Sequence, residues 1–192
     1  DKAILFLTDV FGLPLVNNKL LADDFARNGF KTYVPDLFAG DSVNPDAMTT
    51  GTFNREEWSP NHTQEKTRPI IDKLMTALEA QGVTRFAAVG YCFGGRYVFD
   101  LAFDHKIAAA AVAHPSRLQT PADLEKYAAT ATAPLLINSC TVDKQFPVEA
   151  AIQADEILKG FAPGYKREHF EGCTHGFAVR GDMSIPAVKA GK

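Results

Sequence analysis

Residues 85–103 read RFAAVGYCFGGRYVFDLAF, and this stretch indicates the fold. Its beginning is an apolar, β-prone run, and its end places apolar residues at helical spacing. Glycines stand two positions before and two positions after Cys92, so a strand and a helix can approach closely around a strained bend. The stretch therefore predicts a strand, a tight turn that presents Cys92, and a helix.

Further β-rich runs on either side of this stretch alternate with helix-like segments. They cover residues 3–8, 31–34, 107–113, 134–139 and 166–170, with helical apolar spacing in 20–25, 70–78 and 148–158. Apolar strands that alternate with helices are typical of a mostly parallel sheet with helices on both faces. We expect a single α/β domain over residues 1–192, incomplete at both termini because strand-like sequence begins almost at once and no terminal element closes the chain.

Residues 40–69 interrupt this alternation with prolines, glycine and threonines, together with the aromatic residues Phe53 and Trp58. A long connection inside a compact domain is usually a functional loop. We therefore expect a long loop or lid-like insert here.

Charge and cysteine content narrow the functional class. The 20 Lys and Arg residues against 23 Asp and Glu give a net charge of −3, which provides no basic field for nucleic acid or an anionic membrane. The three cysteines have no paired spacing, and no apolar run is long enough to span a bilayer. No metal-ligand cluster or phosphate-binding glycine loop is found. We expect a cytoplasmic monomer or homodimer that binds a small molecule without a metal or another cofactor.

Cys92 is the candidate nucleophile. The pattern G-x-C-x-G between a strand and a helix matches a nucleophile elbow with sulfur in place of the serine oxygen. A helix N-terminus lowers the pKa of a thiol there and offers free N–H groups to an oxyanion, with the amide of Phe93 as the first donor. The alternative is that Cys92, like Cys140 and Cys173, is only a packed core residue.

A thiol nucleophile needs a base, and in this kind of fold an acid and then a histidine follow on loops after later strands. Asp143 follows the run 134–139, and His175 follows the run 166–170. The competing base is His114, which also ends a strand-like run and otherwise lines the site or packs in the core. We expect His62 and the remaining histidines to lie on the surface.

Aromatic side chains flank several of the predicted strand ends. Phe11, Phe38, Tyr91 and Phe177 each stand beside a strand-end loop, so they predict an apolar, aromatic-lined pocket.

Several motifs together resemble the dienelactone hydrolase family of the α/β-hydrolase fold, including its fungal members. These are Thr8-Asp-Val-Phe-Gly12, Tyr33-Val-Pro-Asp-Leu-Phe38, Gly90-Tyr-Cys-Phe-Gly-Gly95, Ala113-His-Pro-Ser116, Asp143 and His175-Gly-Phe177. The resemblance implies a triad of Cys92, Asp143 and His175, with oxyanion donors from the backbone of Phe93 and Val10.

The resemblance also implies roles for two charged residues. Asp9 matches an acidic residue, usually Glu, that interacts with the resting thiol in family members. Arg180 is a candidate for one of two arginines that bind a substrate carboxylate in bacterial members, and the second arginine has no match in 40–69.

These features predict a hydrolase of small activated esters or enol lactones that acts through a thioester on Cys92. An alternative is a hydrolase-like binding protein that only holds a small ligand. A third hypothesis is a redox-sensing thiol protein, with Cys173 as the resolving cysteine.

Overall fold

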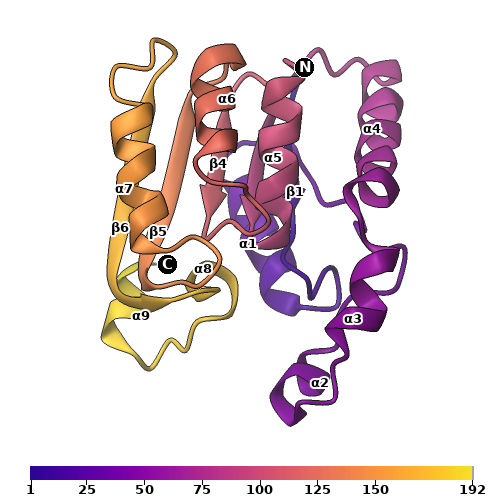
Figure 1. The fold of residues 1–192 in the computed structure, drawn as a ribbon. Coiled ribbons are helices and arrows are strands. Elements are labelled where there is room, and N and C mark those ends of the chain that lie inside the picture. Colours follow the sequence, from indigo (N-terminus) through magenta and orange to yellow (C-terminus); the bar gives the residue numbers. More distant parts are fainter. Residues whose placement is uncertain (192) are drawn as a thin grey trace.

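The computed structural model describes residues 1–191 and contains a six-stranded sheet in the order β2-β1-β3-β4-β5-β6 (Figure 1). Every neighbouring pair of strands is parallel. The strands are β1 (Lys2–Leu7), β2 (Thr32–Tyr33), β3 (Arg85–Tyr91), β4 (Ala110–Ala113), β5 (Leu135–Val142) and β6 (Tyr165–Thr174). The six predicted β-rich runs are confirmed as strands, and the predicted α/β architecture is confirmed with them.

Helices cover both faces of this sheet. One face packs against α4 (Gln64–Ala80), α5 (Phe93–Phe103), α6 (Ala122–Thr130) and α7 (Val148–Ile157), which stand in front of the sheet in Figure 1. The other face packs against α1 (Val16–Arg27) and α8 (Phe177–Arg180). The short helix α9 (Pro186–Gly191) lies against β6. Because both faces are covered, strands β1, β3 and β4 are apolar along most of their length.

Strand β1 shows this double burial most clearly. Leu5, Phe6 and Leu7 are 0% exposed although successive side chains point to opposite faces of the sheet. Leu5 and Leu7 pack with α4 and α5, whereas Phe6 packs in the cluster that contains Ala22 of α1. Continuous apolar sequence is therefore required on this strand, as expected for a parallel sheet covered on both sides.

The segment 40–69 holds more regular structure than the long loop expected from its composition. It contains α2 (Pro45–Thr50), α3 (Arg55–Trp58), the 3₁₀ turn η1 (Ser59–Asn61) and the start of α4. The side chains of Asn44 and Asn54 accept backbone N–H groups at the starts of α2 and α3, so these short helices begin at ordinary N-caps. In Figure 1, α2 and α3 extend beyond the sheet at the end where the strands finish. A lid-like role stays a prediction.

Among the helices of residues 1–191, none has the length and apolar character needed to cross a bilayer.

Candidate active site

Cys92 occupies the bend between β3 and α5. Its backbone has φ 48° and ψ −108°, a conformation that is strained for a residue with a side chain. A Cβ added to Gly94 would lie 2.1 Å from the carbonyl oxygen of Leu7, and one added to Gly90 would lie 2.6 Å from Val98 Cγ2. The glycines are therefore required because α5 starts in direct contact with β1 and β3. The predicted strand, tight bend and helix are all present.

His175 and Asp143 lie beside this bend. His175 Nδ1 is 2.8 Å from both carboxylate oxygens of Asp143. The carboxylate is fixed in turn, because its Oδ1 accepts the backbone N–H groups of Gln145 at 2.7 Å and Phe146 at 3.0 Å. The His175 ring lies close enough to the Cys92 thiol for each group to shift the pKa of the other. The structure thus brings together the nucleophile, base and acid candidates, from the ends of β3, β6 and β5.

The environment changes the ionisation of both the thiol and the imidazole. Burial raises the pKa of Cys92, but the hydrogen bond and charge of His175, the charge of Arg180 and the Ser116 hydroxyl together hold that pKa below its ordinary value. Burial lowers the pKa of His175, whereas Asp143 and Cys92 raise it, to about 9 in total. Both shifts favour a thiolate facing an imidazolium over the neutral pair.

Two backbone amides that follow β1 and β3 are free to donate. Phe93 is the first residue of α5, so its N–H has no acceptor within the helix. Gly94 N–H donates to Thr8 O at 3.0 Å, which places the start of α5 next to the loop that carries Val10. The N–H groups of Phe93 and Val10 have no acceptor among residues 1–191, as an oxyanion site requires.

Asp9 has a different partner from the one that the family resemblance implies. Its carboxylate is 0% exposed and pairs with the guanidinium of Arg180. Its Oδ1 also accepts Phe11 N–H at 3.3 Å and Asn18 Nδ2 at 3.1 Å. Within the described chain the carboxylate makes no hydrogen bond to Cys92. The shorter Asp side chain is held by arginine and asparagine instead of the thiol.

Asn18 is a site residue that the sequence analysis did not identify. Its side chain is 0% exposed and also donates to Gly12 O at 2.8 Å, so it joins the loop after β1 to helix α1. Asn18 stands in the first turn of a surface helix, where asparagine is ordinary, and no pattern in the sequence distinguishes it from Asn17.

Arg180 lies along the rim of this cluster. Its guanidinium sits 5.0 Å from the ring centre of Phe11, and its side chain is 24% exposed. A Cβ on Gly176 would come within 2.6 Å of the guanidinium, so glycine is needed there for the arginine to fold back toward Asp9.

His114 lies behind the catalytic candidates rather than in contact with the thiol. It is 0% exposed, and its ring centre is 5.0 Å from that of His175 and 5.4 Å from that of Phe177. Neither ring nitrogen has a hydrogen-bond partner in the described part of the chain. Burial, followed by the charges of His175 and Arg180, lowers the pKa of His114 well below its ordinary value. The ring is therefore neutral and packs against His175.

The aromatic candidates Phe11, Tyr91 and Phe177 are buried, and their role as a pocket lining stays a prediction. Tyr91 packs on Phe6 with ring centres 4.9 Å apart, and Phe177 packs on Phe170 at 4.8 Å. Phe11 is 5% exposed and lies beside Arg180. These three side chains support the residues around the thiol from within the core.

The surface position expected for His62 is wrong. His62 is 5% exposed, its Nε2 is 2.9 Å from Asp41 Oδ2, and its ring lies 4.1 Å from that of Trp58. Phe38 packs on both Trp58 and Phe93, so the segment 40–62 is joined to the start of α5 through aromatic rings. Histidine has too little sequence context in an irregular segment for such packing to be predicted.

The other two cysteines lie on the far side of the acid candidate, and the sulfur of Cys140 is 3.9 Å from Asp143 Oδ2. Cys140 and Cys173 pack with Phe177 and Val188, and burial raises the pKa of Cys140 to about 12. Cys173 is 0% exposed and its thiol is free, as are those of Cys92 and Cys140, so a resolving role for it stays a prediction. No group of three or more metal-ligating side chains occurs in residues 1–191.

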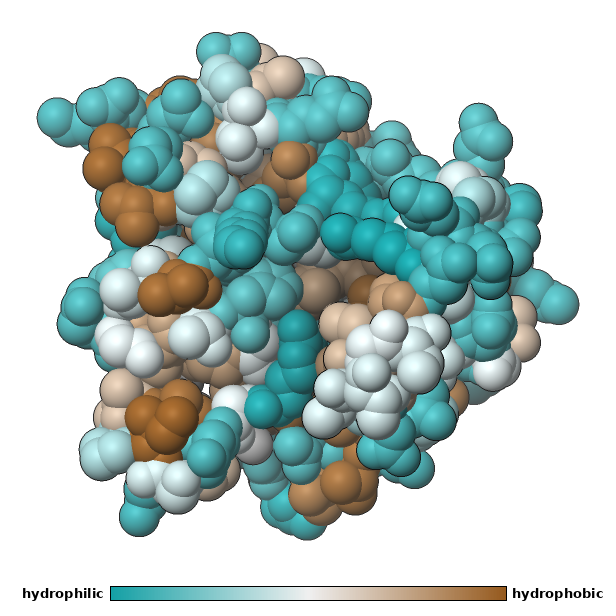
Figure 2. All heavy atoms as spheres, turned by 60° about the horizontal axis from the view of Figure 1, so that its bottom comes forward, coloured by the Kyte–Doolittle hydropathy of each residue, from teal (hydrophilic) through white to brown (hydrophobic). Residues whose placement is uncertain are grey.

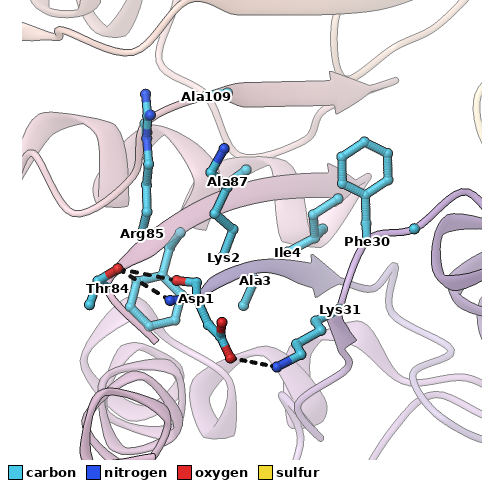
Figure 3. A pocket seen from close by; sticks show the side chains of 13 residues that line it. Asp1, Lys2, Ala3, Ile4, Phe30, Lys31, Thr84, Arg85, Ala87 and Ala109 are labelled. Carbon is cyan, nitrogen blue, oxygen red and sulfur yellow. Dashed lines mark hydrogen bonds and ion pairs between the residues drawn. The ribbon is translucent and has the colours of Figure 1, made fainter. Parts of the chain in front are cut away.

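Figure 2 turns the face at the carboxyl ends of the strands toward the viewer, and this face is hollowed near its centre. A separate cavity of about 870 Å³ lies at the opposite end of the sheet, around the first residues of β1 and β3. Lys2, Lys31 and Arg85 surround it, and Lys31 pairs with Asp1 (Figure 3). Ligands of parallel α/β sheets bind at the carboxyl ends of the strands, where Cys92, Asp143 and His175 lie.

Known proteins resemble this chain along its whole length. The dienelactone hydrolase family matches residues 1–192. Hydrolase pyvD of Aspergillus violaceofuscus is 38% identical over 95% of this chain and 72% of its own. Hydrolase tropI of Talaromyces stipitatus is 33% identical over 98% of this chain and 75% of its own.

A solved structure agrees with the fold. A dienelactone hydrolase-like promiscuous phosphotriesterase from metagenomic libraries has a TM-score of 0.70 at 20% identity, over 100% of this chain and 82% of its own. Given the all-parallel sheet, the bend at Cys92 and these matches, the chain belongs to the dienelactone hydrolase family of hydrolases.

Proposed function

We propose that this hydrolase cleaves small activated carboxylic esters or enol lactones through a thioester on Cys92. The observation that carries this proposal is the strained bend that presents Cys92 beside a His175 ring held 2.8 Å from Asp143. In this setting the pKa of the thiol is lowered and that of His175 is raised to about 9. A thiolate is the reactive form of cysteine, and an adjacent imidazolium can give a proton to a leaving group.

The first half of the reaction forms the thioester. The Cys92 thiolate attacks the carbonyl carbon, and the N–H groups of Phe93 and Val10 hold the resulting oxyanion. The imidazolium of His175 protonates the leaving oxygen as its bond to carbon breaks. Asp143 keeps the ring oriented through Nδ1, to which it lies at 2.8 Å.

The second half hydrolyses the thioester. Neutral His175 takes a proton from water, the water oxygen adds to the carbonyl, and the carbon–sulfur bond breaks with its electron pair on sulfur. The carboxylic acid leaves, and the thiolate and imidazolium return to their starting states.

The sulfur nucleophile limits the substrates. A thiol with an ordinary pKa of roughly 8.5 is a better leaving group than an alcohol, so adducts of unactivated alkyl esters revert to the starting materials. Enol lactones, aryl esters and thioesters have good leaving groups of their own and avoid this return. We propose that Arg180 supports the thiolate from the rim through its positive charge, and that the buried Asp9 holds Arg180 in this position.

A comparison of two cysteine variants tests this function. Cys92→Ala should abolish hydrolysis of an aryl ester panel, whereas Cys173→Ala, which removes a buried thiol that packs against Val188, should retain it. Equal rates in the two variants would remove Cys92 from the reaction.

A further inference from the structure

Ser116 lies in the turn after β4 and faces the Cys92 sulfur. Its hydroxyl oxygen is 3.7 Å from Cys92 Sγ, and the residue is 5% exposed. Within residues 1–191 this hydroxyl makes no other hydrogen bond. A buried hydroxyl usually finds a backbone or side-chain oxygen as its partner, so a contact with sulfur alone calls for an explanation.

The backbone holds Ser116 in this position. Its N–H donates to Cys92 O at 2.9 Å, and the Cys92 N–H donates to Ala113 O at 3.2 Å. The residues around it have strained conformations, with φ 39° at His114 and φ 64° at Arg117. The turn and the bend are therefore locked together by two hydrogen bonds, and the hydroxyl is presented to the sulfur from a fixed frame.

Close packing fixes the same turn from a second side. A Cβ added to Gly95 would lie 2.7 Å from Pro115 Cβ, so the second glycine of the pair in α5 leaves room for this turn. Arg117 donates to His62 O at 2.7 Å and lies 4.7 Å from the ring centre of Phe93. Ser116 is thus held between two anchored residues and cannot easily turn away from Cys92.

We propose that Ser116 is a further catalytic residue, whose hydroxyl donates a hydrogen bond to the Cys92 thiolate. The thiol form donates its proton toward Ser116 Oγ, as the structure has it, and the direction reverses when the sulfur is ionised. This inference rests on the proposed function, in which the thiolate attacks in the first step and departs in the second.

The hydroxyl differs from the other groups near the sulfur because it carries no charge. His175 and Arg180 act on the thiolate as cations, Asp9 is matched by Arg180, and His114 behind His175 is neutral. Ser116 can donate at every stage, so it stabilises the thiolate that forms as the carbon–sulfur bond of the thioester breaks.

The test is the pH dependence of Cys92 alkylation by iodoacetamide, followed by peptide mass mapping. Ser116→Ala removes the donor, and the half-maximal pH should rise by about one unit, since a hydrogen bond to a charged group has roughly that effect. Ser116→Thr restores a hydroxyl and should return the midpoint toward that of the parent. Ser184→Ala, in an exposed turn, is the matched control and should leave it unchanged.

A second hydroxyl-free variant, Ser116→Gly, guards against misfolding of the first, and far-ultraviolet circular dichroism of each variant checks the fold. Midpoints equal to that of the parent in both hydroxyl-free variants would overturn the role of Ser116. That result differs from failure of the proposed function, which shows as ester hydrolysis that persists in Cys92→Ala.

Discussion

Arg180 is ion-paired to Asp9, a carboxylate with 0% of its surface exposed. The two residues stand 171 positions apart in the chain, so the pair fastens helix α8 to the loop after β1. The positive charge of Arg180 also contributes to the lowered pKa of Cys92. The pair therefore connects the stability of this end of the sheet with the reactivity of the thiol.

Removing the arginine should destabilise the fold strongly. Arg180→Gln leaves Asp9 buried with only Phe11 N–H and Asn18 as donors, and an uncompensated buried charge costs about 3–5 kcal/mol. The double variant Asp9→Asn/Arg180→Gln should be less destabilised, because no unpaired carboxylate remains. Urea unfolding measures the free energy of unfolding of each variant.

The control for this prediction is Arg27→Gln. Arg27 pairs with Asp24 at 2.6 Å, but the two side chains are 67% and 59% exposed, so its loss should have a small effect. Equal losses of stability in Arg27→Gln and Arg180→Gln would show that the buried pair is not important for folding.

Gly94→Ala should be among the most damaging single-methyl additions in the chain. The new Cβ would lie 2.1 Å from the carbonyl oxygen of Leu7. Neither atom can rotate away, because the oxygen belongs to the backbone and the Cβ is attached directly to it. Gly160 has φ 75° but open space around it. Gly160→Ala should therefore lower the free energy of unfolding by only about 1–2 kcal/mol, through backbone strain. Thermal unfolding should give a much lower midpoint for Gly94→Ala, and similar midpoints would contradict the close contact between α5 and β1.

His114 should make stability sensitive to acid. The unfolded chain binds a proton near the ordinary histidine pKa of about 6.5, whereas buried His114 does so only at much lower pH. Below about pH 6.5 the unfolded state therefore carries one proton more than the native state. The free energy of unfolding then falls by up to about 1.4 kcal/mol for each unit by which the pH is lowered. His114→Phe should remove this part of the slope in urea unfolding between about pH 6.5 and about pH 5.

The exposed His105 provides the comparison. His105→Gln should keep the pH slope of the parent, because this side chain lies in solvent. If His114→Phe also kept that slope, the buried ring would have to be protonated in the native state.

Asp143→Asn should slow ester hydrolysis by about a hundredfold or more, the usual scale of acid–base catalysis. Without the carboxylate, the pKa of His175 should fall from about 9 toward its ordinary value, since Asp143 is the leading group that raises it. Histidine NMR titration measures that pKa directly. The control is Asp155→Asn, which breaks a pair with Arg167 on β6 and should change neither the rate of hydrolysis nor the pKa of His175. A His175 pKa that stayed near 9 in Asp143→Asn would contradict the pairing of Asp143 with His175.

Periodicity and the bend motif predict the fold well because both follow from local geometry. Six apolar runs correspond to six strands, and the glycines around Cys92 occupy positions where a Cβ would clash. The helices in 40–69 were missed because they are short and depend on caps at Asn44 and Asn54 rather than on an apolar stripe.

Partnerships across the chain are harder to predict. Asp143 and His175 could be named from the sequence because each follows a predicted strand, and the carboxyl ends of parallel strands lie at the same end of the sheet as Cys92. The burial of His62, the link from Asn18 to Asp9, and the contact of Ser116 with Cys92 depend on tertiary packing of residues without a local pattern.

The most direct test of the account is the mass of the protein during turnover of an aryl ester. The reaction is quenched in acid before steady state, and the enzyme is digested and mapped. We predict an acyl group on the peptide that contains Cys92, released by hydroxylamine as a thioester should be, and absent from Cys92→Ala. An acyl group on another residue, or hydrolysis with Cys92 never modified, would contradict the account.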